Sequence, residues 1–424
     1  MQWINNEAFV IESKNFGAVV QLTGTRDQSF GAASAMGGNN YEHVPWGAND
    51  NKPNEMNRLK EANNQVKPLL EAMRDMIYAS GLGFFKRTIK DGKQRFDPYT
   101  DAKLEDWSFE TELENYIIGI INERVTNGNP FTRFEFTPGG VPLLSVSDSF
   151  TTRIGRPAGK GKPISNFYLN PNFGDRQYFN PKDSEQIPAF DKRNPKANIV
   201  SILHCREIVS GNPFYDFPSW WLAKDWIELA NLIPLFHKSG IKNGYNLKYL
   251  IKMPRDYFDK DGGKELDQKA VSAKWAQFGD SLKQWLSGVD NVNKSLLVRY
   301  LRGEDGKALD SVDVVPLKNE QSDDAYSKVW EMANVSITNA TGLLPVLGGV
   351  TPGSKSGDSG SQVRVVADYQ QHYRTPVHRH IVLEPTVYAL RLLGYTDVFP
   401  MFKGVQLTTL DQNPNGKQAV VNQA

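Results

Sequence analysis

Residues 217–240 carry the feature that most restricts how this chain can fold. A turn, NPFYDFP, leads into a helix that stops at Gly240, since Pro is tolerated near a first helical turn, where its missing N–H would have no intrahelical partner. The apolar residues of this helix occupy more than one stripe: Trp220, Trp221, Trp226, Ile227, Leu229, Leu232, Ile233, Leu235 and Phe236. A helix that is apolar on several sides is buried on several sides. The segment therefore predicts a helix enclosed by several neighbours, which Pro234 kinks or loosens in its last turn.

The composition also points to burial against other chains. The 424 residues include 49 basic and 48 acidic side chains, and the net charge of +1 excludes a basic nucleic-acid-binding glove and an acidic tail. The hydrophobic share is only 39%, yet 9 Trp, 16 Tyr and 22 Phe are too many for a disordered protein. Because Trp and Tyr are favoured at interfaces, a polar chain rich in aromatics suggests large surfaces buried against other chains.

Cysteine content and the N-terminus restrict the setting of the protein. The one cysteine, Cys205, rules out an intramolecular disulfide framework and a cysteine-based zinc or iron–sulfur site, so a reducing compartment is the simplest setting. Residues 1–20 have no basic region followed by a long apolar run, and they read as short strands rather than a signal peptide. No stretch reaches the roughly 18 consecutive apolar residues of a membrane span. We therefore expect neither export nor a membrane partner.

Hydrophobic spacing and turn residues predict an α+β chain. Helices are expected at about 53–80, 106–124, 217–240, 266–286, 322–340 and 362–393. Pro376 and Pro385 should interrupt the last of them. Strands are expected at 8–11, 17–20, 83–89, 132–136, 143–146, 167–169, 199–207, 247–251, 296–301 and 313–317. Residues 151–163 read as a basic Gly/Pro-rich loop, and 170–197 as an exposed excursion.

Phosphate-binding and histidine-based motifs are incomplete. Gly155–Gly161 is similar to a P-loop, but it is one residue short between its glycines and does not end in Lys-Ser/Thr. As a flexible basic loop it would touch phosphate only nonspecifically. His372, His378 and His380 form a histidine cluster without a zinc signature. We interpret them as solvated or interface histidines on a long helix.

Other candidate catalytic groups also have simpler explanations. His204 and Cys205 are adjacent, and adjacent residues of a strand point to opposite faces, so they form no dyad and we expect a buried structural cysteine. The carboxylates of DYFDKDGG lack the order of a calcium loop and read as a solvated turn. We therefore predict no catalytic residue, no metal site and no cofactor. A structural or binding protein is favoured over an enzyme.

The order of elements after residue 210 resembles that of the portal, or head–tail connector, proteins of tailed bacteriophages. NPFYDFPSWW at 212–221, leading to FHKSGIKNG at 236–244, is similar to the "Tyr-Gly-x-Pro-x-Trp" start and "Phe-x-x-Asn-Gly" end of a portal helix. Asp216 stands where portal proteins usually have glycine. VVPL at 314–317 precedes an acidic helix start, again as in portal proteins.

Three further segments carry the same resemblance. LPVLGG at 344–349 is similar to the portal "Pro-Pro-x-Leu-x-Gly", with Leu344 where the first proline is usual. A Gly/Ser linker and then residues 364–393 follow, as in the next portal helix. WGANDNKP at 46–53 resembles the portal opening. The excursion near 151–197 has no counterpart that we can place.

The resemblance implies an α+β portal fold with a wing, a two-helix stem, an α/β clip and a tunnel loop, assembled as a ring that normally has twelve subunits. The implied regions are wing 1–210, first stem helix 211–240, clip 241–318, second stem helix 319–340, tunnel loop 341–361, wing or tunnel helix 362–394 and a short crown-like tail 395–424. A stem helix that packs between neighbours in a ring should be apolar on several faces, as 217–240 is.

The resemblance also implies site residues. For the DNA channel and tunnel loop these are Leu344, Gly348, Gly349, Thr351, Lys355 and Ser356, and we expect the glycines to make that loop flexible. For stem packing they are Trp220, Trp221, Trp226, Leu229 and Phe236. For docking of other proteins on the clip they are Tyr257, Trp275, Trp285 and Arg302.

The implied function is a passive conduit for DNA at one capsid vertex, through which the terminase packages the genome and DNA later leaves to the tail. The implied partners are other copies of the chain, double-stranded DNA, the terminase large subunit, the major capsid protein, and head-completion, adaptor and tail proteins. The implied location is the virion, after assembly in the host cytoplasm. Two alternatives remain open: another multimeric phage component such as a head-completion adaptor or capsid protein, and an enzyme, for example a nuclease, with an unrecognised site.

Overall fold

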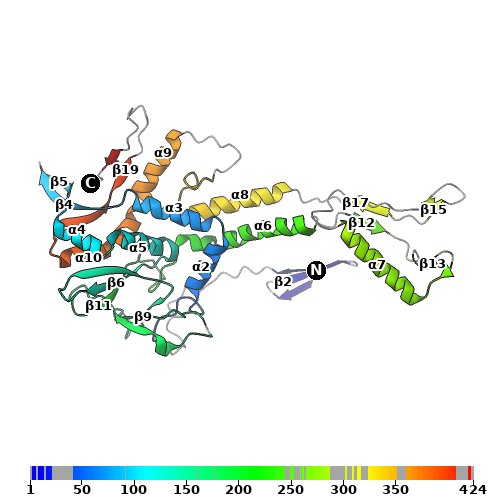
Figure 1. Ribbon diagram of the computed structural model, residues 1–424, viewed down its shortest axis with the longest axis horizontal. Coiled ribbons are helices and arrows are strands. Elements are labelled where there is room, and N and C mark those ends of the chain that lie inside the picture. Colours follow the sequence, from blue (N-terminus) through cyan, green and yellow to red (C-terminus); the bar gives the residue numbers. More distant parts are fainter. Residues whose placement is uncertain are drawn as a thin grey trace.

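The structure, a computed structural model, describes residues 2–5, 8–13, 16–21, 42–90, 92–159, 161–175, 177–243, 249–252, 258, 260–261, 264–286, 301–302, 308–309, 313–316, 323–350, 360–406 and 419–421. Helices and small sheets form a body, and two long helices, α6 (Lys224–Asn243) and α8 (Asp323–Ala340), run side by side from that body to a group of short elements (Figure 1). The mixture of helices and antiparallel sheets confirms the predicted α+β class.

The first helix of the body is broken where an unbroken helix was predicted for 53–80. It forms α2 (Lys52–Ala62) and α3 (Val66–Tyr78). Between them the side chain of Asn63 accepts hydrogen bonds from the backbone N–H groups two and three residues further on, at 2.9 and 3.0 Å. An Asn oxygen used in this way caps the start of the next helix and turns the chain.

The second helix of the body is also broken. The segment predicted as 106–124 begins earlier and forms α4 (Ala102–Glu110) and α5 (Leu113–Asn127). The side chain of Asp101 caps α4 by accepting from a backbone N–H three residues on, at 2.8 Å. Glu112 has a φ of 47°, and a residue in this left-handed region interrupts the helix between α4 and α5.

In the described part of the chain, the body contains three antiparallel sheets of three strands each. The N-terminal sheet is counted separately. The strand orders of the three body sheets are β18-β4-β5, β11-β6-β7 and β10-β9-β8. The strands are β4 (Leu82–Lys90), β5 (Lys93–Pro98), β6 (Phe131–Phe136), β7 (Pro142–Ser147), β8 (Thr152–Ile154), β9 (Asn166–Leu169), β10 (Glu185–Pro188), β11 (Val200–His204) and β18 (Val398–Phe402). The strands predicted between residues 83 and 204 are therefore present, with shifted ends.

The prediction of a loop at 151–163 and an exposed excursion at 170–197 is wrong in part. Strand β8 is fully buried, and it pairs with β9, which in turn pairs with β10. Phe173, Ile187 and Phe190 from the expected excursion lie in the core. Apolar side chains spaced widely between Asn, Asp and Pro give no periodic signal, so only the folded chain gathers them.

Part of the segment expected as a short crown-like tail, 395–424, packs on the body. Strand β18 pairs with β4 along its whole length, and its alternate residues Val398, Pro400 and Phe402 are buried. Alternation with a period of two gives a strand one apolar face, which here lies on the core. After it, β19 (Gly404–Gln406) pairs with β20 (Ala419–Val421).

The far end of the helix pair carries short strands and one helix. Strand β12 (Tyr249–Lys252) pairs with β17 (Asp313–Pro316), and α7 (Gln268–Leu286) lies beside them in Figure 1. Two hairpins, β13 (Lys260–Asp261) with β14 (Lys264–Glu265) and β15 (Leu301–Arg302) with β16 (Ala308–Leu309), complete this group. Of the strand predicted at 296–301, only the last residue lies in the described part of the chain.

The long helix predicted at 362–393 is divided by a π turn. The chain forms α9 (Gly360–Tyr369), a π turn (Gln370–Arg374) and α10 (Pro376–Leu392). Pro376 begins α10, where a proline is tolerated, whereas Pro385 lies inside that helix. At the other end of the chain, β1 (Gln2–Asn5), β2 (Ala8–Ser13) and β3 (Phe16–Gln21) form an antiparallel sheet. Strands were predicted at the positions of β2 and β3, and β1 was not predicted.

One hydrophobic core runs through the body into the base of the helix pair. Fully buried members come from the first loop, α5, α6 and α8, for example Trp46, Ile117, Ile227 and Ile337. Of the helices that the structure describes, none is long and apolar enough to cross a membrane.

Candidate assembly surface

Two motifs that lie far apart in the sequence meet at the base of α6. The rings of Trp46 and Tyr215 stack with 4.5 Å between centroids and 6° between planes. The Tyr215 hydroxyl donates to the carbonyl of Val44 and accepts from the N–H of Ile154, both at 2.8 Å. The opening loop, strand β8 and the turn before α6 are therefore fixed to one another through one buried side chain.

A buried charged cluster fixes the same loop. Arg153, with no exposed surface, donates from Nε to Asp50 at 2.6 Å, and the other Asp50 oxygen lies 2.9 Å from His43 Nε2. Burial raises the pKa of Asp50, but the His43 hydrogen bond and the Arg153 charge outweigh it and hold that pKa below its ordinary value. The carboxylate is thus kept charged and acts as a structural bridge.

Asp216, the residue that departs from the portal pattern, is part of a second cluster. Its carboxylate lies 3.1 Å from Arg124 Nη1, and Arg124 Nη2 also contacts Glu207 at 2.8 Å. The Asn129 side chain holds the backbone of residue 216, accepting from its N–H at 2.9 Å and donating to its carbonyl at 2.8 Å. Burial raises the pKa of Asp216 more than Arg124 lowers it. The cluster ties α5 to the chain that enters α6.

Trp220 and Trp221 anchor the base of α6. They lie in a 3-10 turn, η2 (Ser219–Ala223), and both are buried. The Trp220 indole donates to the carbonyl of Thr126 at 2.9 Å, and the Lys52 ammonium lies 4.8 Å from the ring of Trp221. Two of the five residues expected to pack the stem therefore attach it to the body of the same chain.

One apolar stripe of α6 packs on α8. It contains Ile227 and Ala230, which are buried in the same core as Ala333 and Ile337 of α8, and the two helices are in contact. Small alanines on both helices allow their backbones to approach closely. Further along the pair, the rings of Phe236 and Tyr326 stack at 4.9 Å. The pair is antiparallel, because the end of α6 meets the start of α8.

A second apolar stripe of α6 lies on the opposite side and is exposed. Within α6 it consists of Leu229, Leu232 and Leu235, and Leu222, also exposed, lies just before α6 in the turn η2. At 100° per residue this stripe is centred roughly 180° from Ile227 and Ala230. Leu232 and Leu235 are 59% and 58% exposed, and Leu222 is 77% exposed. Of the expected packing residues, Trp226 is half-buried, Leu229 belongs to this exposed stripe, and Phe236 stacks on Tyr326 of α8.

The segment after α8 folds back on the body in its described part. Residues 344–350 form a compact turn, in which the N–H of Val350 donates to the carbonyl of Pro345 at 3.0 Å. A Cβ on Gly348 would lie 2.7 Å from Thr338 Cγ2 and 2.9 Å from Leu69 Cδ2, so glycine is required there for close packing. Gly349 has a φ of 70°. These two glycines thus serve packing and a left-handed turn, not the flexibility that we expected of them.

The other expected residues are placed only in part. Leu344 lies half-buried in this turn, whereas Thr351, Lys355, Ser356 and Tyr257 lie outside the described residues. Trp275 of α7 packs edge-on against Phe258, with 4.9 Å between ring centroids. Trp285 lies in the last turn of α7, and Arg302 lies in β15.

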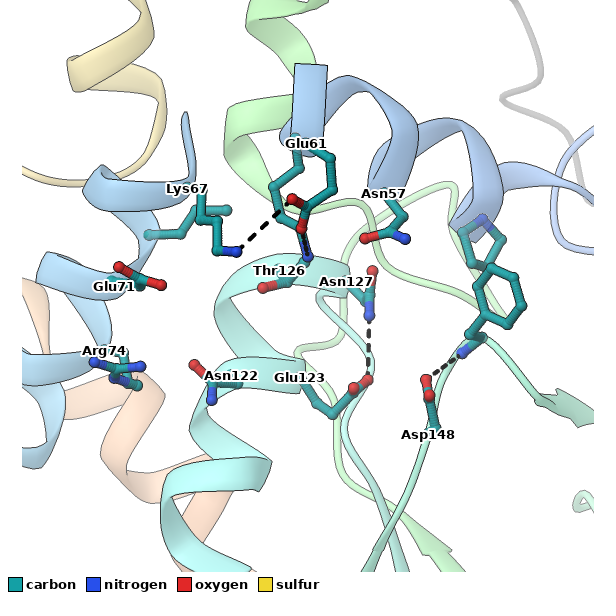
Figure 2. A pocket seen from close by; sticks show the side chains of 14 residues that line it. Asn57, Glu61, Lys67, Glu71, Arg74, Asn122, Glu123, Thr126, Asn127 and Asp148 are labelled. Atoms are coloured by element: carbon teal, nitrogen blue, oxygen red, sulfur yellow. Dashed lines mark hydrogen bonds and ion pairs between the residues drawn. The ribbon is translucent and has the colours of Figure 1, made fainter. Parts of the chain in front are cut away.

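Two clefts lie beside the base of the helix pair. The larger, of about 540 Å³, lies between α2, α3, α5 and the turn after β7 (Figure 2). It holds charges of both signs, and its floor is Glu123, whose pKa is raised by burial and whose carboxylate accepts from Ser149 and Asn127. The other, of about 450 Å³, is lined by Trp330, Gln65 and the turn at Gly348. Neither cleft contains a nucleophile paired with a base.

The histidines and the cysteine that the sequence analysis weighed as catalytic groups can now be placed in the structure. Burial lowers the pKa of His204 to about 3, and its ring stacks on Phe131 at 4.4 Å. Cys205 is buried, as predicted, and burial raises its pKa well above the ordinary value. His378 is half-buried, with its Nδ1 3.4 Å from Arg124 Nε, and burial first and Arg124 second lower its pKa to about 4. In the described part of the chain, no group of His, Cys, Asp and Glu is placed to hold a metal ion.

Several residues that hold this region together were not singled out in the sequence analysis. Asp50, Arg153 and Arg124 are ordinary charged residues in the sequence, and only their buried contacts identify them as structural bridges.

The arrangement defines a class of protein: an α+β body that extends an antiparallel helix pair with one unpartnered apolar face. No protein-family model and no curated protein matches the sequence. Solved structures share the fold. A chain from the virion of a native gene transfer agent (GTA) particle has 16% identity and a TM-score of 0.51, over 85% of each chain.

Two further comparisons describe the neck of the same kind of particle. A chain from the neck of a native GTA particle, computed with C12 symmetry, has 16% identity and a TM-score of 0.51, over 85% of this chain and 86% of that one. A phage portal protein of the HK97 family from Corynebacterium diphtheriae has 8% identity and a TM-score of 0.42, a likeness too weak to bear on the fold. The chain therefore has the fold of a protein found in the GTA neck.

Proposed function

We propose that this chain is a portal protein, whose copies assemble into a ring around a DNA channel at one capsid vertex. The observation that carries the proposal is the second apolar stripe of α6. A row of leucines on an exposed helix face marks a surface that another protein surface covers. The opposite face of α6 is already used within the chain, so a neighbouring copy is the natural cover.

The likeness to chains of the GTA neck supports the ring. One of those necks is described with C12 symmetry. Transferred to this chain, that symmetry corresponds to a ring of twelve copies. In a closed ring, every copy has its α6 stripe covered by a neighbour. In an open chain of copies, the stripe of the last copy would stay exposed.

The proposal assigns a role to each part of the chain. The body, including α9, α10 and strand β18, is the wing, and α6 with α8 is the stem. The elements between them, β12 to β17 with α7, are the clip. Residues 341–361 are the tunnel loop, which leaves the packed turn at Gly348 and returns at the start of α9. In this assignment Thr351, Lys355 and Ser356 face the channel.

The channel is proposed to conduct DNA without binding it tightly. Each phosphate that a Lys or Arg neutralises adds salt-dependent affinity, which would retard sliding. A chain with 49 basic and 48 acidic side chains suits a conduit rather than a DNA-binding site. The chain is therefore proposed to act without chemistry of its own, as a structural protein and not an enzyme.

The partners follow from the same role. The terminase large subunit drives DNA inward from the clip, where Tyr257, Trp275, Trp285 and Arg302 are the proposed docking residues. Head-completion, adaptor and tail proteins later bind the same end, and the major capsid protein surrounds the wing. The protein is assembled in the host cytoplasm and is then part of the virion.

Electron microscopy of the purified protein tests this proposal. Rings with an axial hole, of twelve copies or a nearby number, are the expected result. A protein that stays monomeric at high concentration would refute the proposal. Closed rings without a hole wide enough for duplex DNA would favour a different phage component, and metal-dependent cleavage of DNA would favour an enzyme.

Deletion of residues 351–359 tests the channel loop separately. The packed turn at Gly348, beside Thr338 and Leu69, precedes the deleted residues. We expect rings to form as before, whereas DNA packaging in a complementation assay is lost. Normal packaging by the deleted variant would contradict the assignment of the loop to the channel.

A further inference from the structure

A third apolar stripe is exposed on the helix α9, the π turn and α10. Val365, Tyr369, Tyr373 and Val377 follow one another at intervals of four residues. They are 64%, 46%, 73% and 54% exposed. The rings of Tyr369 and Tyr373 stack on each other at 5.0 Å, so these side chains share one face. The stripe is about 18 Å long at 1.5 Å per residue.

The inner side of the same π turn is held firmly. Gln370 is fully buried, and its side-chain nitrogen donates to the carbonyl of Gly342 at 2.8 Å. Thr375 is also fully buried. A π turn is rare and costs helix regularity, and such turns occur often at functional sites. Here the turn presents two tyrosines outward while it holds the start of the proposed tunnel loop inward.

The charges around the two exposed stripes are complementary. On the α6 stripe, Asp225 and Glu228 are exposed between the leucines. On the α9–α10 stripe, Arg374 is exposed directly beside Tyr373. Among the described residues, Arg374 has no ion pair within this chain, and Glu228 has only a long contact of 3.9 Å with Lys224. Opposite charges placed in this way orient two surfaces and favour the correct pairing.

The two helices that carry the stripes also lie on different sides of α8. Figure 1 shows α9 rising from the body on one side of the layer that contains α3 and α8, whereas α6 runs along the other side of α8. A ring needs such a pair, because a head-to-tail interface joins two different surfaces of successive copies. Two copies of one surface would instead pair face to face and stop at a dimer.

We propose that the stripe at Val365, Tyr369, Tyr373 and Val377 docks on the exposed α6 stripe of the neighbouring copy, with Arg374 opposite Asp225 and Glu228. This inference rests on the proposed ring and names the surface that closes it. Since Gln370 connects the same π turn to Gly342, contact with a neighbour also fixes the root of each tunnel loop.

Cross-linking between introduced cysteines tests the docking. The variant carries Leu229→Cys and Tyr373→Cys in one chain, and the native Cys205 stays silent because it is buried. With a short bis-maleimide, head-to-tail docking links each copy to the next, so a ladder of covalent multimers is expected on a denaturing gel. Each single variant should stay monomeric, as should a control with Leu229→Cys and Gln186→Cys on the exposed face of β10.

The outcomes separate this inference from the portal proposal. Rings of the double variant without a ladder would overturn the docking surface and leave the portal proposal in place. Dimers from the Leu229→Cys variant alone would overturn it as well, because α6 would then face its own copy. A wild-type protein that forms no ring would refute the portal proposal and this inference together.

A charge exchange gives an independent measurement. Arg374→Glu should weaken ring assembly by on the order of tenfold, because it places like charges opposite each other. Adding Asp225→Arg and Glu228→Arg should restore much of the loss. Unchanged assembly by the Arg374→Glu variant, or no recovery in the exchanged variant, would overturn the proposed orientation.

Discussion

Arg124 and Asp216 form a buried ion pair, with 3.1 Å between Nη1 and the carboxylate, that joins α5 to the chain entering α6. Arg124→Met should lower the free energy of unfolding by about 3 kcal/mol, the low end for breaking a buried pair, because it leaves the buried Asp216 carboxylate without its cation. Urea denaturation followed by tryptophan fluorescence measures this loss. As a control, Asp191→Asn changes an exposed carboxylate and should leave the transition unchanged.

Stability should depend on pH through His378. Burial and the neighbouring Arg124 lower its pKa from 6.5 to about 4, so the folded protein favours the neutral ring. The stabilisation is therefore complete above pH 6.5 and is lost as the pH falls from there towards 4. The melting temperature of the wild type should fall over this range, and that of His378→Gln should fall less. His380→Gln, at an exposed position, should follow the wild type.

Gly348 should not tolerate a side chain. Its Cβ would overlap Thr338 and Leu69, so Gly348→Ala should destabilise the body by about 1–3 kcal/mol. Gly279 in α7 is the matched control, because a Cβ there meets nothing within 4 Å. Gly279→Ala should be neutral or stabilising by up to about 1 kcal/mol. Thermal unfolding measures the stability of both variants. An equal loss of stability in the two variants would contradict the packing argument.

The exposed α6 stripe should be needed for assembly and not for folding. Leu232→Glu places a charge on a surface that is 59% exposed in the single chain, so the circular dichroism spectrum of the variant should match that of the wild type. A charge buried without a partner in an interface is costly, so the variant should not form rings. Mass photometry measures the distribution of oligomers. Gln186→Glu adds the same charge on β10 and should leave the rings intact; a Leu232→Glu ring would argue against the α6 interface.

Much of the fold could be predicted because its signals are local. The apolar spacing of residues 217–240 predicted a long helix near its observed position, and strands with alternating residues were found to within a few positions. The helix breaks could not be predicted in this way. Asn63 and Glu112 lie in stretches of good helical spacing, and the chain turns there because α2 and α4 must each pack on the core in their own direction.

The candidate assembly surface could also be predicted only where its signal is local in the sequence. Sequence periodicity alone determined that the helix before Gly240 has apolar residues on more than one side, because the angular position of each residue on a helix follows from its number. Only the tertiary structure decided which side is which: Ile227 and Ala230 are covered by α8, and Leu229 and Leu232 are not. That difference depends on contacts with residues about a hundred positions away, which local spacing does not contain. The same reason made Asp216 an odd residue in the sequence and a buried partner of Arg124 in the fold.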